Sequence, residues 1–205
     1  MSPERLGILG GTFNPIHNQH LLLGKCALNQ LSLDKLLLIP SGISYLKEGT
    51  NVLPADIRYA MCALAVKDME HFEISDIEVR RKGNSYTCDT LRELSAIYKD
   101  TCFYYITGAD TLFMMDKWKE PEYIFSHCII AVAARLDESS YTDAKIKEKM
   151  MEYKSRYGAR TELIDIPVSD LSSSMIRRAV AAGEDIRSFV PGAVADYIYR
   201  NGLYR

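Results

Sequence analysis

Short, almost continuously apolar runs alternate with longer segments of helical period along most of this chain. The runs lie at Leu6–Leu9, Lys35–Ile39, Cys102–Ile106 and Cys128–Val132. Strands that helices cover on both faces have this composition, because neither face of the strand meets water. The sequence therefore predicts a parallel sheet with strands at these runs.

The segments between the runs carry apolar residues at the spacing of amphipathic helices. In the segment 57–65 they fall at i, i+3, i+4, i+7 and i+8, and the segment 91–98 repeats this spacing after Asp89, a candidate N-cap. A helix that joins two parallel strands makes a crossover, and such crossovers are right-handed almost without exception. We expect the α/β class, with helices on both faces of the sheet.

The end of the chain has the signals of a compact helical unit. Ser172–Ser174 offer a serine cap, Gly183 a glycine stop, Pro191 the start of a last helix and Gly202 its end. A length of 205 residues suits one domain. We expect a single domain over 1–205, with a core at 1–168 and a small C-terminal helical unit at 169–205.

Charge and composition exclude several classes of function. The chain has 25 Lys and Arg against 27 Asp and Glu, a net charge of −2, whereas binding to nucleic acid or an acidic membrane needs a basic surface. The five cysteines are an odd number at wide spacing without a Cys-x-x-Cys pair, which argues against a disulfide framework and a zinc knuckle.

Neither a membrane span nor a signal peptide is expected. The apolar run Ile129–Ala134 is far shorter than the roughly 18 residues that cross a bilayer. Met1–Arg5 leads directly into the first predicted strand and lacks the charged head, apolar middle and cleavage site of a signal peptide. We therefore expect a cytoplasmic protein.

A glycine pair at the end of the first predicted strand marks the most informative segment. Gly10 and Gly11 are followed by a tight loop and a helix start, where His17 and His20 stand three residues apart. In a parallel sheet this position forms the ligand crevice. Glycines let the backbone approach a ligand, and N–H groups at a helix start attract phosphate. Because both imidazoles lie on one face of the first turn, we expect them to bind the same anion.

Other interpretations of this segment fit less well. A G-x-x-x-x-G-K-[ST] loop ending at Gly24-Lys25 needs glycine at Gln19 and a hydroxyl at Cys26, and the G-x-G-x-x-G fingerprint is absent. A pair of histidines without a third ligand is weak evidence for zinc, so no protein-bound metal is expected. Taken alone, a His-x-x-His pair also serves to cap a helix.

The motifs together resemble the nucleotidylyltransferase superfamily, and within it most closely the bacterial nicotinate-mononucleotide adenylyltransferases. The superfamily marker Gly-Gly-x-Phe-Asp-Pro, then His-x-Gly-His, corresponds to residues 10–15 and 17–20. Further family motifs follow in order at Ser85–Thr90, Gly108–Asp110, Lys117-Trp118 and Ser172–Arg177. The resemblance covers essentially the whole chain. It implies a Rossmann-like sheet and transfer of AMP from Mg-ATP to nicotinate mononucleotide, giving deamido-NAD and pyrophosphate.

The expected catalytic residues are His17, His20 and Arg177. A mononucleotide has a second phosphate pKa of about 6, so it is an anionic nucleophile at neutral pH and needs no strong base. Positioning and charge neutralisation remain, and the histidines should donate hydrogen bonds to the α-phosphate. Ser172–Ser174 with Arg177 are predicted to bind the β- and γ-phosphates, although by themselves they suit a plain serine cap beside a solvated arginine.

The ligands implied are ATP and nicotinate mononucleotide. For ATP the expected contacts are Gly10, Gly11, Thr12, Phe13, His17, His20, Lys47, Ser172, Ser173, Ile176 and Arg177. Mg²⁺ would enter with ATP, held mainly by phosphate oxygens and water, because the sequence offers no dedicated carboxylate cage. The oligomeric state stays open, a homo-oligomer included.

For the acceptor, the resemblance assigns contacts to Tyr86, Thr87, Gly108, Asp110, Trp118 and Arg135. The Trp118 indole would stack on the nicotinate ring, Asp110 would contact the ribose, and Arg135 would bind the phosphate. Backbone N–H groups around Tyr86 and Thr87 would bind the pyridine carboxylate. Each has a plain structural alternative: a rim tryptophan, a helix cap and a surface arginine.

Three positions depart from the family pattern. Asn14 replaces an aspartate, Gln19 replaces a glycine and would crowd ATP or offer it an amide, and Ser44–Lys47 stands where members usually have Pro-Pro-His-Lys. Two alternatives stay open: a pantetheine-phosphate adenylyltransferase, and an inactive protein that senses dinucleotides. The histidines and Arg177 argue against a sensor, which has no need of a transition-state clamp.

Overall fold

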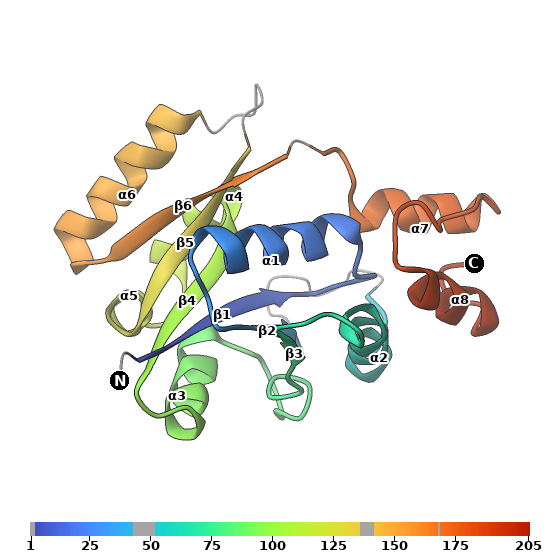
Figure 1. Ribbon diagram of the computed structural model, residues 1–205, viewed down its shortest axis with the longest axis horizontal. Helices are drawn as coiled ribbons and strands as arrows, with labels where there is room; N and C mark the ends of the chain where they lie inside the picture. The colour runs from blue at the N-terminus through green and yellow to red at the C-terminus, as the bar shows by residue number, and fades with distance from the viewer. Residues whose placement is uncertain (1–2, 43–51, 136–141, 168) are drawn as a thin grey trace.

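The computed structural model describes residues 3–42, 52–135, 142–167 and 169–205. Within these ranges one parallel sheet has the strands β1 (Glu4–Gly11), β2 (Lys35–Pro40), β3 (Phe72–Ile74), β4 (Thr101–Gly108), β5 (Cys128–Arg135) and β6 (Arg160–Ile166). Their order is β3-β2-β1-β4-β5-β6 (Figure 1). The predicted parallel sheet is confirmed, and every predicted strand belongs to it.

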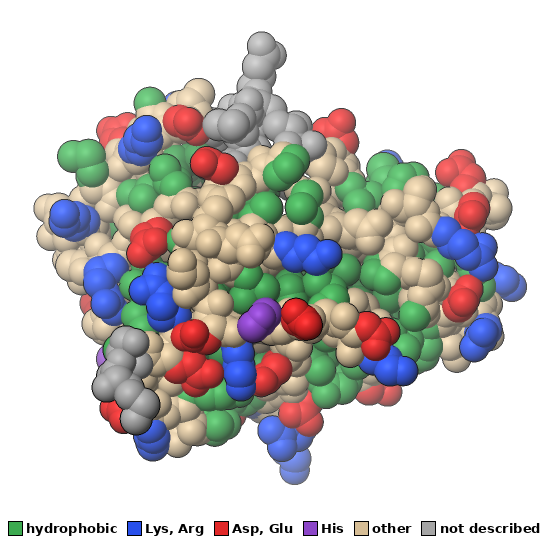
Figure 2. All heavy atoms as spheres, in the orientation of Figure 1, with side chains coloured by type: hydrophobic (Ala, Val, Ile, Leu, Met, Phe, Trp, Pro, Cys, Tyr) green, Lys and Arg blue, Asp and Glu red, His purple; other side chains and the backbone are tan. Residues whose placement is uncertain are grey.

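Helices occupy the connections between the strands and the end of the chain. They are α1 (Asn18–Gln30), α2 (Ala55–Val66), α3 (Thr87–Ile97), α4 (Ala109–Leu112), the 3-10 turn η2 (Met115–Lys117), α5 (Pro121–His127), α6 (Asp143–Tyr157), α7 (Ser173–Ala181) and α8 (Gly192–Arg200). None of the described helices is both long and apolar enough to cross a bilayer. Acidic and basic side chains are interspersed on the face that Figure 2 shows.

Both faces of the sheet are buried, which explains the continuous apolar runs. In β2, Leu36 and Leu38 face the core formed with α1, α2, α7 and α8, whereas Leu37 and Ile39 face the core formed with α3, α4, α5 and α6. Successive side chains of a strand point to opposite faces, so a strand covered twice must be apolar at every position. The predicted α/β class with helices on both faces is confirmed.

The start of α3 differs from the prediction. The helix begins at Thr87 with Tyr86 at the N-cap, so Asp89 lies in the first turn rather than at the cap. A carboxylate there still suits the positive end of the helix dipole. Asp89 also accepts hydrogen bonds from Arg92 of the same helix at 3.2 Å and from Lys119 at 3.0 Å, and the second of these links α3 to the segment before α5.

The C-terminal helices begin and end as the sequence predicts. Ser172 Oγ accepts the Met175 N–H at 3.2 Å, Gly183 follows α7 with φ +77°, and Pro191 precedes α8. Figure 1 shows both helices at the opposite end of the molecule from α6, with α8 beside α2. The proposed division at 168 and 169 stays a prediction.

The order of the strands places a ligand crevice. β1 is followed by α1 on one face of the sheet, whereas its neighbour β4 is followed by α4 on the other face. Two such connections leave the sheet in opposite directions, and a crevice opens between them at the carboxyl ends of the strands. The predicted glycine pair lies at this point.

Candidate active site

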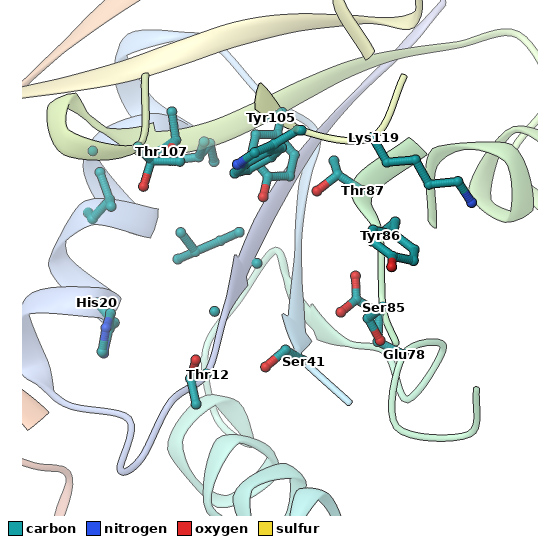
Figure 3. A pocket seen from close by; sticks show the side chains of 18 residues that line it. Thr12, His20, Ser41, Glu78, Ser85, Tyr86, Thr87, Tyr105, Thr107 and Lys119 are labelled. Atoms are coloured by element: carbon teal, nitrogen blue, oxygen red, sulfur yellow. The ribbon is translucent and has the colours of Figure 1, made fainter. Parts of the chain in front are cut away.

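A cavity of about 360 Å³ opens at the carboxyl ends of β1 and β4. Figure 3 shows polar side chains around it, with His20 and Thr12 on one side and Tyr86 and Lys119 on the other. The residues that line it are Leu9, Gly10, Gly11, Thr12, His20, Leu23, Ser41, Glu78, Ser85, Tyr86, Thr87, Tyr105, Ile106, Thr107, Gly108, Thr111, Trp118 and Lys119.

The glycine loop forms one wall of the cavity, as predicted. Gly10, Gly11 and Thr12 line it, whereas Phe13 lies beneath the loop, 2% exposed and with φ +48°. A Cβ atom on Gly11 would lie 2.9 Å from the Phe13 ring, so only glycine fits above it. Phe13 therefore supports this wall from inside and does not line the cavity.

The two predicted histidines lie together at the start of α1. Their rings stack with centroids 3.7 Å apart and an angle of 24° between the planes. His20 lines the cavity, and His17, the N-cap of α1, lies behind it and is 4% exposed. The backbone N–H of His17 donates to Nδ1 of His20 at 3.3 Å. An Nδ1 atom that accepts carries no proton, so neutral His20 has its hydrogen on Nε2.

Helix α7 is fastened to the loop between the glycines and the histidines. An NH1 hydrogen of Arg177 is donated to the Asn14 carbonyl oxygen at 2.8 Å, and Ser173 Oγ donates to that of Pro15 at 2.8 Å. Arg177 lines a separate cavity of about 470 Å³ between α7 and the C-terminus. Through these contacts, the predicted phosphate residues Ser173 and Arg177 hold the glycine–histidine loop.

The remaining predicted ATP residues have different positions. Ser172 is an exposed N-cap, and the Ile176 side chain is fully buried in the core, where it packs α7 against the sheet. Lys47 lies outside the described residues. Of the predicted ATP residues, Gly10, Gly11, Thr12 and His20 therefore line the cavity, whereas Ser172 and Ile176 do not.

The predicted acceptor residues gather at the other wall. Tyr86, Thr87, Gly108 and Trp118 line the cavity, and the Trp118 ring meets Tyr105 edge to face, with centroids 5.9 Å apart. Trp118 is half-buried. This position is compatible with an exposed indole face, which stacking on a flat ring requires.

Asp110 and Arg135 lie at strand ends beside this wall. Asp110 is exposed in the first turn of α4 and does not line the cavity. Its Oδ1 atom lies 2.6 Å from where a Cβ on Gly108 would be, so a side chain at 108 would displace the carboxylate. Arg135 is the last residue of β5, and its side chain is outside the described part of the chain.

Residues 8–179 match the family model described as cytidylyltransferase-like. The chain belongs to the cytidylyltransferase-like family. Members of one family share a fold more surely than a substrate, so the relatives and the site must define the activity.

The relatives of this family member have consistent names. A protein of Lachnoclostridium phytofermentans named probable nicotinate-nucleotide adenylyltransferase is 41% identical over 98% of this chain and 99% of its own length. A protein of Clostridium acetobutylicum with the same name is 37% identical over the same shares. A Plasmodium falciparum nicotinic acid mononucleotide adenylyltransferase, solved in complex with NaAD, matches with a TM-score of 0.77 at 19% identity, covering 98% and 97% of the two chains. This last likeness shows the shared fold.

Several residues of this family member's cavity were missed by sequence reasoning. Ser41 and Thr107 lie at the carboxyl ends of β2 and β4, so the rule that placed the glycines could have found them. Glu78 has no such signal. Its Oε1 atom accepts the Thr90 hydroxyl at 2.7 Å, and burial raises the pKa of its carboxyl.

A buried arginine on α2 was also missed. Arg58 is 2% exposed and donates to backbone carbonyl oxygens only: NH1 to Thr12 at 2.6 Å, NH2 to Ser41 at 2.6 Å and to Gly42 at 3.1 Å, and Nε to Leu53 at 2.9 Å. Burial lowers the pKa of its guanidinium. A lone arginine in a helical pattern gives no hint of these partners, which come from three separate segments.

Two departures from the family pattern have structural roles. Gln19 Nε2 donates to the Pro167 carbonyl oxygen at 3.2 Å, which links α1 to the segment after β6. Asn14 Oδ1 accepts from the Tyr204 hydroxyl at 2.8 Å and the Leu53 N–H at 3.3 Å. An amide oxygen accepts these bonds as an aspartate oxygen would, so Asn14 keeps the structural contacts without the charge.

The described residues offer no carboxylate cage for a metal in the cavity. Glu78 is the only acidic residue among those that line it. Cys88, Asp89 and Glu120 place ligand atoms within 4.8 Å of one another, but Arg92 and Lys119 already bind the two carboxylates.

Proposed function

We propose that this chain transfers the adenylyl group of ATP to nicotinate mononucleotide, giving nicotinate adenine dinucleotide and pyrophosphate. The observation that carries the proposal is the pair of stacked histidines at the start of α1, of which His20 lines a cavity whose opposite wall contains Trp118. The names of relatives that are 41% and 37% identical over nearly their full lengths support the same activity.

The reaction needs little covalent chemistry from the protein. A phosphate oxygen of the mononucleotide attacks the α-phosphorus of ATP and forms a new P–O bond, while the bond to the bridging oxygen breaks and pyrophosphate leaves with the electron pair. The acceptor phosphate is already anionic at neutral pH, so no general base is required. The chain has to align the two nucleotides and offset the negative charge.

His20 stabilises the charge that develops on the α-phosphate. Because Nδ1 accepts the His17 N–H, Nε2 is the ring nitrogen of neutral His20 that carries a hydrogen and donates it to the phosphate. His17 holds the ring by stacking, and the N–H groups at the start of α1 add a positive partial charge. One such donor contributes about 3 kcal/mol to transition-state stabilisation.

Gly10, Gly11 and Thr12 of the cavity wall let the ATP phosphates approach the backbone. Ser172, Ser173 and Arg177 do not line this cavity, so we assign them, with Lys47, to the β- and γ-phosphates on the family resemblance alone. A magnesium ion that enters with ATP would supply positive charge to the departing pyrophosphate. We further propose that the protein acts in the cytoplasm, where ATP and mononucleotides are supplied.

Trp118, Tyr86 and Thr87 hold the nicotinate ring and its carboxylate at the opposite wall. Gly108 leaves room for Asp110, which binds the ribose, and Arg135 binds the acceptor phosphate. Stacking on an indole holds any flat pyridine, so the discrimination between acid and amide depends on the polar groups around Tyr86.

The test is pyrophosphate release by the purified protein with Mg-ATP and, in separate reactions, nicotinate mononucleotide, nicotinamide mononucleotide or phosphopantetheine. We expect turnover with nicotinate mononucleotide. Turnover with phosphopantetheine alone would show a pantetheine-phosphate adenylyltransferase. Binding of nucleotides without any turnover would show a sensor. The variant His20→Ala controls for contaminating activity.

A further inference from the structure

Arg58 is a buried cation, and within the described residues its hydrogen bonds go to backbone carbonyl oxygens. Within the described ranges no carboxylate forms an ion pair with it. Taking a charge out of water is costly unless a partner offsets the loss of hydration. Here the offset comes from four hydrogen bonds to carbonyl dipoles.

Two of these four carbonyl groups belong to residues in different walls of the substrate cavity. Thr12 continues the glycine loop after β1, and Ser41 follows β2; both residues line the cavity. A guanidinium is planar, and its donors have fixed relative directions. The two nitrogens NH1 and NH2 of Arg58 therefore set the spacing between the Thr12 and Ser41 backbones.

The hold of Arg58 extends to a third wall segment. Its NH2 also donates to the Gly42 carbonyl oxygen, and a Cβ on Gly42 would lie 2.2 Å from the Glu78 carbonyl oxygen. Gly42 is thus wedged against the segment that contributes Glu78 to the cavity. The Ser41 N–H donates to the Gly11 carbonyl oxygen at 2.8 Å, which joins the first two walls directly.

The orientation of a peptide group in the loop also depends on Arg58. In a trans peptide the C=O and the following N–H point in opposite directions. When the Thr12 carbonyl is turned toward Arg58, the Phe13 N–H is turned away from it. A loop without this bond is free to rotate that peptide.

We propose that Arg58 is a positioning residue for adenylyl transfer: from behind the cavity it bridges the Thr12 and Ser41 backbones and holds the ATP-binding walls at their working distance. Only the kinetic test of this inference rests on the proposed function. Misplacement of reacting groups by about 1 Å can cost on the order of 100-fold in rate.

The test compares Arg58→Lys with Arg5→Lys. A lysine keeps the charge but has one compact ammonium group that cannot bridge the same carbonyls with a planar fork. Arg5 is a matched control, because its Nε and NH2 also donate to a backbone carbonyl oxygen, that of Leu31, away from the cavity. The measurements are kcat, KM for both substrates, the dissociation constant of ATP and the melting temperature.

We expect Arg58→Lys to lower kcat about 10-fold or more and to weaken ATP binding, with KM for the acceptor changed less than about threefold. Arg5→Lys should leave kcat, both KM values and the dissociation constant of ATP near those of the wild type, even where it lowers the melting temperature as much as Arg58→Lys does. A folded Arg58→Lys with wild-type kcat and ATP affinity would overturn the proposal. If the wild-type protein does not use nicotinate mononucleotide, the proposed function fails, but the effect of Arg58→Lys on ATP affinity still tests the role of Arg58. Failure of the proposed function and failure of the Arg58 proposal are therefore distinguishable.

A measurement on the unaltered protein covers the case in which Arg58→Lys does not fold. The Arg58 Nε–H is held by the Leu53 carbonyl oxygen at 2.9 Å and is expected to give a resolved signal in nitrogen-15 NMR spectra. Saturating Mg-ATP should shift this signal and leave the Arg5 Nε–H signal in place. An Arg58 signal that ATP does not move would contradict the coupling.

Discussion

His17 and His20 stack face to face, and the backbone N–H of His17 fixes the tautomer of the His20 ring. His17 therefore orients the His20 ring and does not itself line the cavity. A spacing of three residues put both rings on one face of α1, but only one of them lines the cavity. In the proposed reaction the donor to the α-phosphate is His20 Nε2, and His17 keeps the His20 ring in place.

His20→Ala should lower kcat by about 100-fold or more, with little change in the dissociation constant of ATP. The reason is that a donor to a developing charge stabilises the transition state more than the bound substrate. Steady-state kinetics and calorimetry measure the two quantities. His71→Ala is the control, because His71 is exposed and contacts the Asp34 carbonyl oxygen. A loss confined to KM would refute this role.

Gln19→Gly tests whether glutamine, in place of the family's glycine, affects the binding of ATP. The Gln19 amide is turned to the Pro167 carbonyl oxygen, so we expect KM for ATP to change by less than about threefold. The free energy of unfolding should fall by about 1 to 2 kcal/mol, because glycine is unfavourable in a helix and one hydrogen bond is lost. Denaturant titration measures this. A KM that falls 10-fold would instead show that Gln19 crowds the nucleotide.

Gly42→Ala should destabilise the protein by about 1 to 3 kcal/mol and reduce turnover. Its Cβ would lie 2.2 Å from the Glu78 carbonyl oxygen, and a backbone atom can yield only if the cavity wall moves. Thermal unfolding and the pyrophosphate assay measure both effects. Gly192→Ala is the matched control: a Cβ there meets nothing within 4 Å at the first position of α8, so its stability should stay level or rise. Equal stability and turnover of the two variants would contradict the close packing of Gly42 against the Glu78 carbonyl oxygen.

Glu78→Gln should make stability less dependent on pH. Burial raises the pKa of Glu78 above its ordinary value of 4.5, so ionising this carboxyl costs more in the folded than in the unfolded chain. Its unfavourable effect is absent below about pH 4.5 and develops as the pH rises through the folded-state pKa.

The glutamine variant should therefore gain stability relative to wild type at neutral pH, and the gain should vanish toward pH 4. Glutamine keeps an oxygen that accepts the Thr90 hydroxyl. Urea unfolding at a series of pH values measures the difference. Glu73→Gln, an exposed glutamate paired with Lys35, should not show a gain that grows with pH. A gain for Glu78→Gln that is largest at low pH would reverse the sign and refute the prediction.

The sequence by itself determined four strands of the parallel sheet, the limits of the last helices and the position of the crevice, but not the strands β3 and β6. These depend on local rules: a strand buried on both faces is apolar at every position, as in Leu36 to Ile39, and a ligand binds where parallel strands end. Gly10, Gly11 and His20 were found in this way. Asp89 was misplaced because Tyr86 caps α3 three residues earlier.

The tertiary structure alone decided which residues support the site and which face it. Arg177 holds the Asn14 carbonyl oxygen across 163 positions of sequence, and Arg58 bridges segments that lie apart in the chain. Such contacts leave no local period or spacing in the sequence. They form because the sheet brings the ends of β1 and β2 together beside α2 and α7, and a long cationic side chain then satisfies backbone oxygens that water no longer reaches.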